Sequence, residues 1–202
     1  MTFLRAGLIL LFVIPNPFSN IQAQDLKIGL KGGINISTLS GPQASTEDVS
    51  ARLLFHIGVF ASQEVADKIE AQAELLFSAQ GATEDNDFAA SKIRLNFTYL
   101  NIPLIGKYQV AEGICIYAGI QPGIRLTAEG KILEGQFQGT QDAKDDTKAF
   151  DFALIFGGYY QIQENLFVEA RFVPGLVDIE QDAPIFRNQL VQLSVGYVLV
   201  GN

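Results

Sequence analysis

The sequence has little of the chemistry that identifies most enzymes and metalloproteins. Its 202 residues include one cysteine, one histidine, one methionine and no tryptophan. The single Cys115 excludes an internal disulfide, and because no cysteine stands directly after the expected cleavage point, we expect no lipoprotein anchor. His56 has no second histidine to join, and the acidic run 142–146 lacks the glycine and spaced carboxylates of a calcium loop. We therefore expect neither a metal site nor a cofactor.

Charge and hydrophobicity exclude two further classes of protein. Lysine and arginine total 14 against 22 aspartate and glutamate, and the net charge of −8 leaves no basic footprint for nucleic acid. No later stretch approaches the roughly 18 uninterrupted apolar residues of a membrane-spanning helix. Hydrophobic residues nevertheless make up 48% of the chain and charged residues only 18%, which is unusually apolar for a soluble protein.

The first residues have the pattern of a secretory leader. Arg5 precedes an apolar run over 6–14, a Pro-Asn-Pro break and the sequence Ile21-Gln22-Ala23. This pattern predicts a signal peptide over residues 1–23. Residues 24–202 contain nothing that resembles a linker, so we expect them to form a single domain.

The stretch 149–179 sets the pattern for the rest of the chain. Its first half places Phe150, Leu154 and Tyr160 on one face and Asp151 and Tyr159 on the other, which is the period of a strand. After the turn 163–165 the second half alternates again, with apolar side chains on one face and Glu169 and Arg171 on the other. This is the pattern of an antiparallel hairpin. The charged mid-strand residues favour a barrel with an apolar exterior and a polar lumen.

The same alternation recurs along the whole mature chain. It predicts strands over 26–38, 53–63, 69–78, 92–110, 114–126, 150–162, 166–172 and 191–199. Long polar loops over 39–52, 81–91, 130–148 and 180–187 alternate with short turns, which is typical of outer-membrane barrels. An even number of strands closes without an edge, as lipid requires. We therefore predict an all-β, eight-stranded antiparallel up-and-down transmembrane β-barrel located in the outer membrane.

Two details refine this prediction. The fourth strand changes the parity of its apolar residues, and we expect a bulge near Leu100 and Asn101, before Pro103, to reset the register. Aromatic residues on the apolar face are expected to form two girdles, one at each lipid interface. The long-loop girdle is expected to contain Phe55, Phe77, Phe97, Tyr99, Phe150, Phe152 and Phe172, and the short-turn girdle Tyr108, Tyr160 and Tyr197.

Several short motifs, taken in order, resemble the PorT-like family of outer-membrane β-barrel proteins. They are Gly29-Leu-Lys-Gly-Gly-Ile-Asn35, Ala73-Glu-Leu-Leu-Phe-Ser78, Tyr99-Leu-Asn-Ile-Pro-Leu104 with Lys107-Tyr108, the GIQPG run over 119–123, and Glu169-Ala-Arg-Phe172 followed by Gly175-Leu176. Together they span nearly the whole mature chain. The resemblance implies a secreted outer-membrane barrel. It leaves the activity open, because the name-giving member is linked to protein secretion whereas most members of the family are uncharacterised.

Seven charged or titratable residues share the polar faces of their strands. An eight-stranded barrel has an interior just wide enough for side chains to fill, so we expect these residues to form a structural plug of salt bridges and hydrogen bonds rather than a pore or proton path. A catalytic reading would need His56 beside Ser62, Ser78 or a loop acid such as Asp85 or Asp87. The seven residues are Lys31, His56, Glu70, Glu74, Arg125, Glu169 and Arg171.

These expectations lead to one main functional hypothesis and several alternatives. We expect a non-enzymatic outer-membrane barrel of structural, adhesive or secretion-accessory type, with long acidic extracellular loops. Its partners would be outer-membrane lipid and an envelope or secretion-machinery protein. The alternatives are a barrel enzyme acting on lipid or peptide, and a secreted lipocalin-like carrier, because exchanging inside for outside leaves the period unchanged. A non-selective pore fits poorly with so narrow a lumen.

Overall fold

A computed structural model of the chain describes residues 26–41, 49–86, 91–134, 139–144, 147–179 and 186–201. The expected signal peptide, 1–23, lies outside the described residues. No helix in the described part of the chain has the length and apolarity needed to cross a bilayer. The regular structure consists of eleven strands: β1 (Lys27–Ser40), β2 (Val49–Ala66), β3 (Ile69–Gln80), β4 (Ala82–Asn86), β5 (Ser91–Asn101), β6 (Leu104–Ala111), β7 (Ile114–Glu134), β8 (Gly139–Asp142), β9 (Phe150–Gln163), β10 (Leu166–Pro174) and β11 (Arg187–Val200).

The strands form one antiparallel sheet that closes on itself. Pairing runs from β1 through β2 to β3, then to β5 and β6, and on through β7, β9, β10 and β11. The first and last strands pair over most of their length, from Ile28 opposite Val200 to Ser40 opposite Arg187. Among the described strands of this ring, closure leaves no unpaired edge, which satisfies their backbone polar groups; β8 lies beyond the ring and pairs only with β7.

The described residues form eleven strands and not the eight expected from the alternation. Three interruptions account for the difference. Gly81, at a φ of 144°, separates β3 from β4; Pro103, which has no N–H to donate, lies in the gap between β5 and β6; and residues 143–149 separate β8 from β9. The two strands of each interrupted pair occupy one position around the ring, because they share their neighbours. β3 and β4 both pair with β2 and β5, β5 and β6 both pair with β3 and β7, and β8 and β9 both pair with β7.

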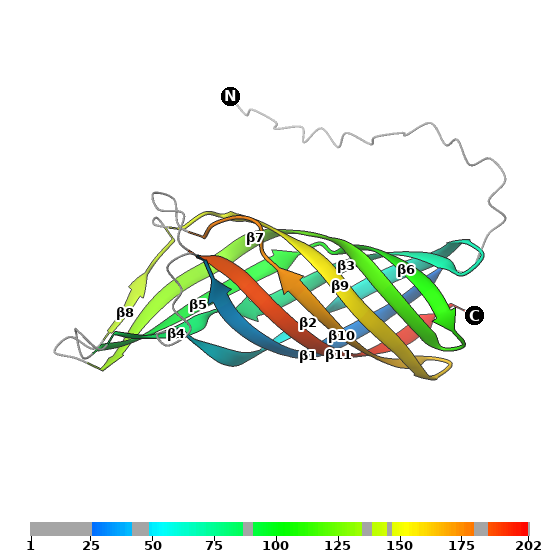
Figure 1. The fold of residues 1–202 in the computed structure, drawn as a ribbon, viewed down its shortest axis with the longest axis horizontal. Coiled ribbons are helices and arrows are strands. Elements are labelled where there is room, and N and C mark those ends of the chain that lie inside the picture. The colour runs from blue at the N-terminus through cyan, green and yellow to red at the C-terminus, as the bar shows by residue number, and fades with distance from the viewer. Residues whose placement is uncertain are drawn as a thin grey trace, which may run out of the picture.

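The two ends of the barrel differ, as Figure 1 shows. Three tight turns, at Asp67-Lys68, Glu112-Gly113 and Glu164-Asn165, lie at one end. At the other end β4, β5, β7 and β8 extend beyond the rest of the barrel (Figure 1). Parts of the expected long loops are therefore regular strand.

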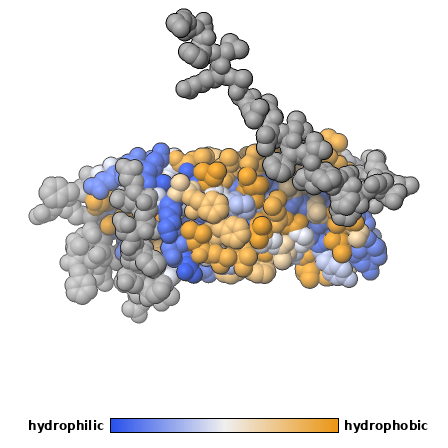
Figure 2. All heavy atoms as spheres, turned by 90° about the horizontal axis from the view of Figure 1, so that it is seen from above, coloured by the Kyte–Doolittle hydropathy of each residue, from blue (hydrophilic) through white to orange (hydrophobic). Residues whose placement is uncertain are grey.

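The side chains face as expected for a membrane barrel. Glu169 is 5% exposed and Arg171 2% exposed, so the charged residues of β10 point into the lumen. The exposed side chains of the same wall are large and apolar, including Phe156 and Val195. On the face shown in Figure 2, apolar residues form a broad belt between two hydrophilic ends. This orientation contradicts a lipocalin-like carrier, which would need a polar exterior and an apolar cavity.

The expected aromatic girdles are confirmed except on β5. At the loop end Phe55 and Phe77 are exposed, with ring centroids 6.2 Å apart, and Phe150 lies at the same end. At the turn end Tyr160 and Tyr197 are exposed, as is Tyr108 on β6.

Phe97 and Tyr99 correct the prediction, because both point into the lumen and are at most 3% exposed. The expected bulge near Leu100 and Asn101 is found only in part. Against β7 the register shifts nearby, between Thr98 and Tyr99, but the parity of β5 is not reset there. The register of β3 passes from Leu76 opposite Asn101 to Ala73 opposite Leu104 without a shift. The parity of the apolar residues misled the prediction because the loop end of the lumen is itself apolar. There Phe97 and Tyr99 pack with Leu39, Ala82, Ala128 and Ile179.

Candidate functional site

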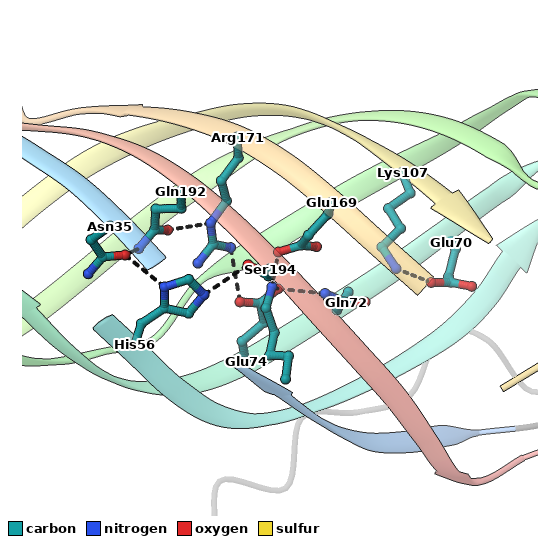
Figure 3. Close-up of polar contacts among 11 residues, drawn as sticks. Asn35, His56, Glu70, Gln72, Glu74, Lys107, Glu169, Arg171, Gln192 and Ser194 are labelled. Carbon is teal, nitrogen blue, oxygen red and sulfur yellow. Dashed lines mark hydrogen bonds and ion pairs between the residues drawn. The ribbon is translucent and has the colours of Figure 1, made fainter. Parts of the chain in front are cut away.

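Four charged side chains meet inside the barrel from three different strands. Lys31 Nζ on β1 lies 2.9 Å from Glu74 Oε1 on β3, and it also bonds to Glu169 on β10. Arg171 Nη1, also on β10, lies 3.0 Å from Glu74 Oε2. All four side chains are at most 1% exposed. We call Lys31, Glu74, Glu169 and Arg171 the ionic quartet, of which Figure 3 labels the last three.

The ionic quartet is balanced in charge and held by neutral side chains. Two cations face two carboxylates, so the cluster has no net charge. Gln72 Nε2 donates to Glu74 Oε1 at 2.6 Å, and Arg171 Nε donates to the side-chain oxygen of Gln192. Buried ions are tolerated only when they are paired and hydrogen-bonded in this way.

His56 lies beside the ionic quartet in a hydrogen-bond chain of its own. Its Nδ1 is 2.7 Å from Asn35 Oδ1, and its Nε2 is 2.8 Å from Ser194 Oγ. The amide of Asn35 is oriented by its donation to Ala79 O at 2.7 Å, so its oxygen faces the imidazole. An amide oxygen only accepts, and Nδ1 therefore carries the proton while Nε2 accepts from the serine hydroxyl.

Two of the seven predicted residues lie elsewhere. Glu70 Oε1 is 2.7 Å from Lys107 Nζ near the short turns, where the ammonium also lies 4.8 Å from the centroid of the Tyr159 ring. Arg125 lies toward the loop end, where its guanidinium donates to Thr147 Oγ1 and to Lys144 O. The structure thus brings five of the seven together at mid-barrel and separates the other two.

Reasoning from sequence missed the neutral partners of the ionic quartet. Ser194 and Gln192 lie on the inward face of β11, and Asn35 lies on that of β1. Neither Ser62 nor Ser78 bonds to His56; the partner is Ser194, 138 positions away. Asp85 and Asp87, the acids considered for a catalytic role, fall where side chains are not described. The only signal for Ser194 was its polar position on an alternating strand.

The described residues contain no group of three histidine, cysteine, aspartate or glutamate side chains placed to hold a metal ion. Cys115 is a free, partly buried thiol on β7. It lines a polar pocket of about 110 Å³ at the short-turn end together with Lys107, Glu70 and Tyr159.

The mid-barrel site is therefore a buried, charge-balanced network of salt bridges and hydrogen bonds. The aromatic rings of Phe60 and Phe167 lie beside it, 5.4 Å apart, and the ring of Tyr159 lies 4.7 Å from that of Phe167. A second apolar cluster, which includes Ile155 and Leu190, also fills the lumen.

Comparisons with known proteins agree with this architecture. The profile of the family described as "Outer membrane protein beta-barrel domain" matches residues 22–181. Among solved structures, the attachment invasion locus protein Ail of Yersinia pestis is similar at 11% identity and a TM-score of 0.52, covering 86% of this chain and 98% of Ail. Neisserial surface protein A is similar at 11% identity and a TM-score of 0.51, covering 85% and 96% of the two chains. No curated protein sequence matches the chain.

At these identities the solved structures support the fold, while the family profile covers most of the sequence. The closed antiparallel sheet, the apolar belt and the enclosed charges are the features that such proteins use in lipid. The chain belongs to the family of outer membrane protein beta-barrel domains and is located in the outer membrane.

Proposed function

We propose that this chain is a non-enzymatic outer-membrane barrel with a closed lumen, which serves a structural, adhesive or secretion-accessory role through its loop end. The PorT-like motifs favour the secretion-accessory form. The observation that carries the proposal is the ionic quartet, whose members reach across the lumen from β1, β3 and β10 and are at most 1% exposed. A lumen filled by paired side chains has no path for solutes.

Extension of the strands beyond the apolar belt supports a role for the loop end. β7 continues to Glu134 and pairs with β8, while β4 pairs with both β2 and β5. A sheet anchored in the barrel holds a contact surface more rigidly than loops alone, and this lowers the entropic penalty of binding a partner.

Conductance of the purified barrel in planar lipid bilayers tests the closed lumen. The wild-type protein is expected to give no stable single-channel steps. The charge-neutral variant Lys31→Ala/Glu169→Ala removes two side chains across the lumen and is expected to conduct. Stable steps from the wild-type protein would contradict the proposal.

Site-specific photocrosslinking in cells tests where the partner binds. A photoreactive amino acid at Thr140, which is exposed on β8, reports on the loop end, and one at Glu164 reports on the short turns. An adhesive or structural role predicts crosslinks from Thr140 to surface molecules. A secretion-accessory role predicts crosslinks to an envelope protein from one of the two sites. If neither site crosslinks to any protein, a protein partner is contradicted.

A barrel hydrolase is a second candidate because Ser194, His56 and Asn35 stand in the order of nucleophile, base and orienting group. The hydroxyl donates to Nε2 and Nδ1–H donates to an amide oxygen, which is the arrangement that activates a serine. Ser194 is only 4% exposed and His56 1% exposed, so a substrate has no approach to the hydroxyl. Two further facts weigh against it: Asn35 Oδ1 also accepts from Gln192 Nε2 at 2.6 Å, and the chain of bonds is internal to the plug.

Labelling with a fluorophosphonate probe decides between the two candidates. The intact barrel is expected to remain unlabelled, and His56→Ala is expected to leave the phospholipid and lipid A composition of cells unchanged. Labelling that disappears in Ser194→Ala would replace the non-enzymatic proposal with a hydrolase.

A further inference from the structure

Two cations stand directly opposite each other on the outer face of the loop-end sheet. Arg94 on β5 pairs with Lys131 on β7. Leu95 packs into the lumen cluster that contains Phe97, so Arg94 points to the outside. Paired residues share a face of the sheet, so Lys131 points outward beside it.

Like charges at directly opposite positions destabilise a sheet unless an anion lies between them. Neither Arg94 nor Lys131 forms a salt bridge with any other described residue, and Arg94 Nε is buried without a hydrogen-bond acceptor. Glu129 shares the outer face with Lys131, two positions along β7, but it lies opposite Asn96 and Asp142, so neither acid stands directly opposite Arg94 or Lys131.

A third cation belongs to the same surface. Arg52 Nη1 reaches across Gly81 to donate to Leu95 O and to Asn96 Oδ1, each at 2.7 Å. Its guanidinium is close enough to Arg94 for the two to repel each other electrostatically. The three side chains therefore concentrate positive charge on a protein whose net charge is −8.

The position of Arg94 and Lys131 along the bilayer normal indicates which anion can reach them. Leu126, 43% exposed, lies at the loop-side rim of the apolar belt, and Arg94 lies four to five residues beyond that level along the sheet. For tilted strands this is roughly 10 Å along the bilayer normal, and long cationic side chains reach back toward the interface. Figure 2 shows a hydrophilic band directly on the loop side of the apolar belt.

We propose that Arg94 and Lys131, assisted by Arg52, bind the phosphate-bearing headgroup of an outer-leaflet lipid. The chemistry is that of guanidinium and ammonium groups donating to phosphate oxygens. Binding relieves the repulsion between the paired cations and fixes the barrel against the leaflet in which its loop end stands. This inference is independent of whether the lumen conducts.

Native mass spectrometry of the whole barrel in phosphatidylcholine nanodiscs tests the site, with diphosphorylated lipid A as the probe. The charge-removing pair Arg94→Gln/Lys131→Gln is expected to weaken lipid A binding by roughly 10- to 30-fold, at about one kcal/mol for each cation near the surface. The matched control Lys68→Gln/Lys144→Gln removes two exposed cations, one at each end of the barrel, and is expected to bind as the wild type does. Arg94→Lys/Lys131→Arg keeps the charge and is expected to retain binding.

Urea unfolding is a second measurement, in which the substitutions are expected to stabilise the barrel rather than weaken it. A misfolded variant would be less stable and so would be distinguished from one that has lost only the lipid site. Without anionic lipid, Arg94→Gln/Lys131→Gln is expected to unfold at the same or a higher urea concentration than the wild type, because a like-charge pair has been removed. The site is overturned if Arg94→Gln/Lys131→Gln binds lipid A as tightly as the control Lys68→Gln/Lys144→Gln does. A phosphate-bearing lipid headgroup is overturned as the ligand if dephosphorylated lipid A binds as tightly as the diphosphorylated form. It is also overturned if inorganic phosphate or a polysulfated glycan displaces lipid A and stabilises the barrel as much as lipid A does.

Discussion

The ring of Phe167 lies over Gly196 on the neighbouring strand, where an added Cβ would lie 2.0 Å from the ring. The ring has no free space to retreat into, because Phe60 and Tyr159 pack against it. Gly29 lies in the same way beneath the ring of Phe60, and such inward glycines make room for large rings in so narrow a lumen.

Replacing Gly196 by alanine is therefore expected to overpack the lumen and to lower the free energy of unfolding by about 1–3 kcal/mol. Urea titration in phospholipid vesicles, followed by heat-modifiable migration, measures this loss. Gly106→Ala is the control, since a Cβ at that position meets nothing within 4 Å. The double variant Gly196→Ala/Phe167→Leu is expected to recover stability, and a Gly196→Ala barrel as stable as the control would contradict the packing argument.

Removing Lys31 alone is expected to destabilise the barrel more than removing it together with Glu169. Lys31→Met leaves an uncompensated carboxylate in the lumen, which costs about 3–5 kcal/mol. Lys31→Met/Glu169→Gln leaves the neutral pair of Glu74 and Arg171, which are 3.0 Å apart. Urea midpoints of the single and double variants measure the difference. Additive losses would show that the two side chains do not interact.

An arginine in place of Leu154 is expected to impair insertion. Leu154 lies between Phe150 and Tyr160 on the outer face of β9, midway between the two aromatic girdles. A cation near the bilayer midplane costs about 2–4 kcal/mol, and one near an interface costs about 0–1 kcal/mol. Ile162→Arg, beyond Tyr160 toward the short turn, is the matched control. Equal folding yields for both variants in vesicles would show that Leu154 does not lie deeper in the bilayer than Ile162.

The absence of tryptophan allows a direct test of which aromatic residues face lipid. Phe77→Trp is expected to be quenched strongly by brominated lipids, because Phe77 is on the outer face. Phe97→Trp is expected to be protected, because Phe97 packs in the lumen. Steady-state fluorescence of the two single-tryptophan variants makes the comparison. Equal quenching would restore the outward placement expected from the alternation.

Much of the fold was predictable because a strand has only two faces. The period of two assigned Lys31 and Glu74 to the polar side and Leu154 to the apolar side, and the short polar breaks located the turns. The same rule failed at Phe97 and Tyr99, since parity does not distinguish an apolar lumen from a lipid-facing belt. It also missed the strand ends, because the extensions at β4 and β8 are polar and read as loop.

The sequence alone determined where the chain turns and, outside β5, which side chains share a face of a strand. It also determined that the protein has more apolar surface than a soluble protein can expose to water. Only the tertiary structure decided which of the enclosed charges meet. Lys31 contacts residues 43 and 138 positions away, and His56 contacts Ser194 at the same long separation. Those pairings depend on the stagger of strands around a closed ring, which is a property of the whole sheet rather than of any one strand.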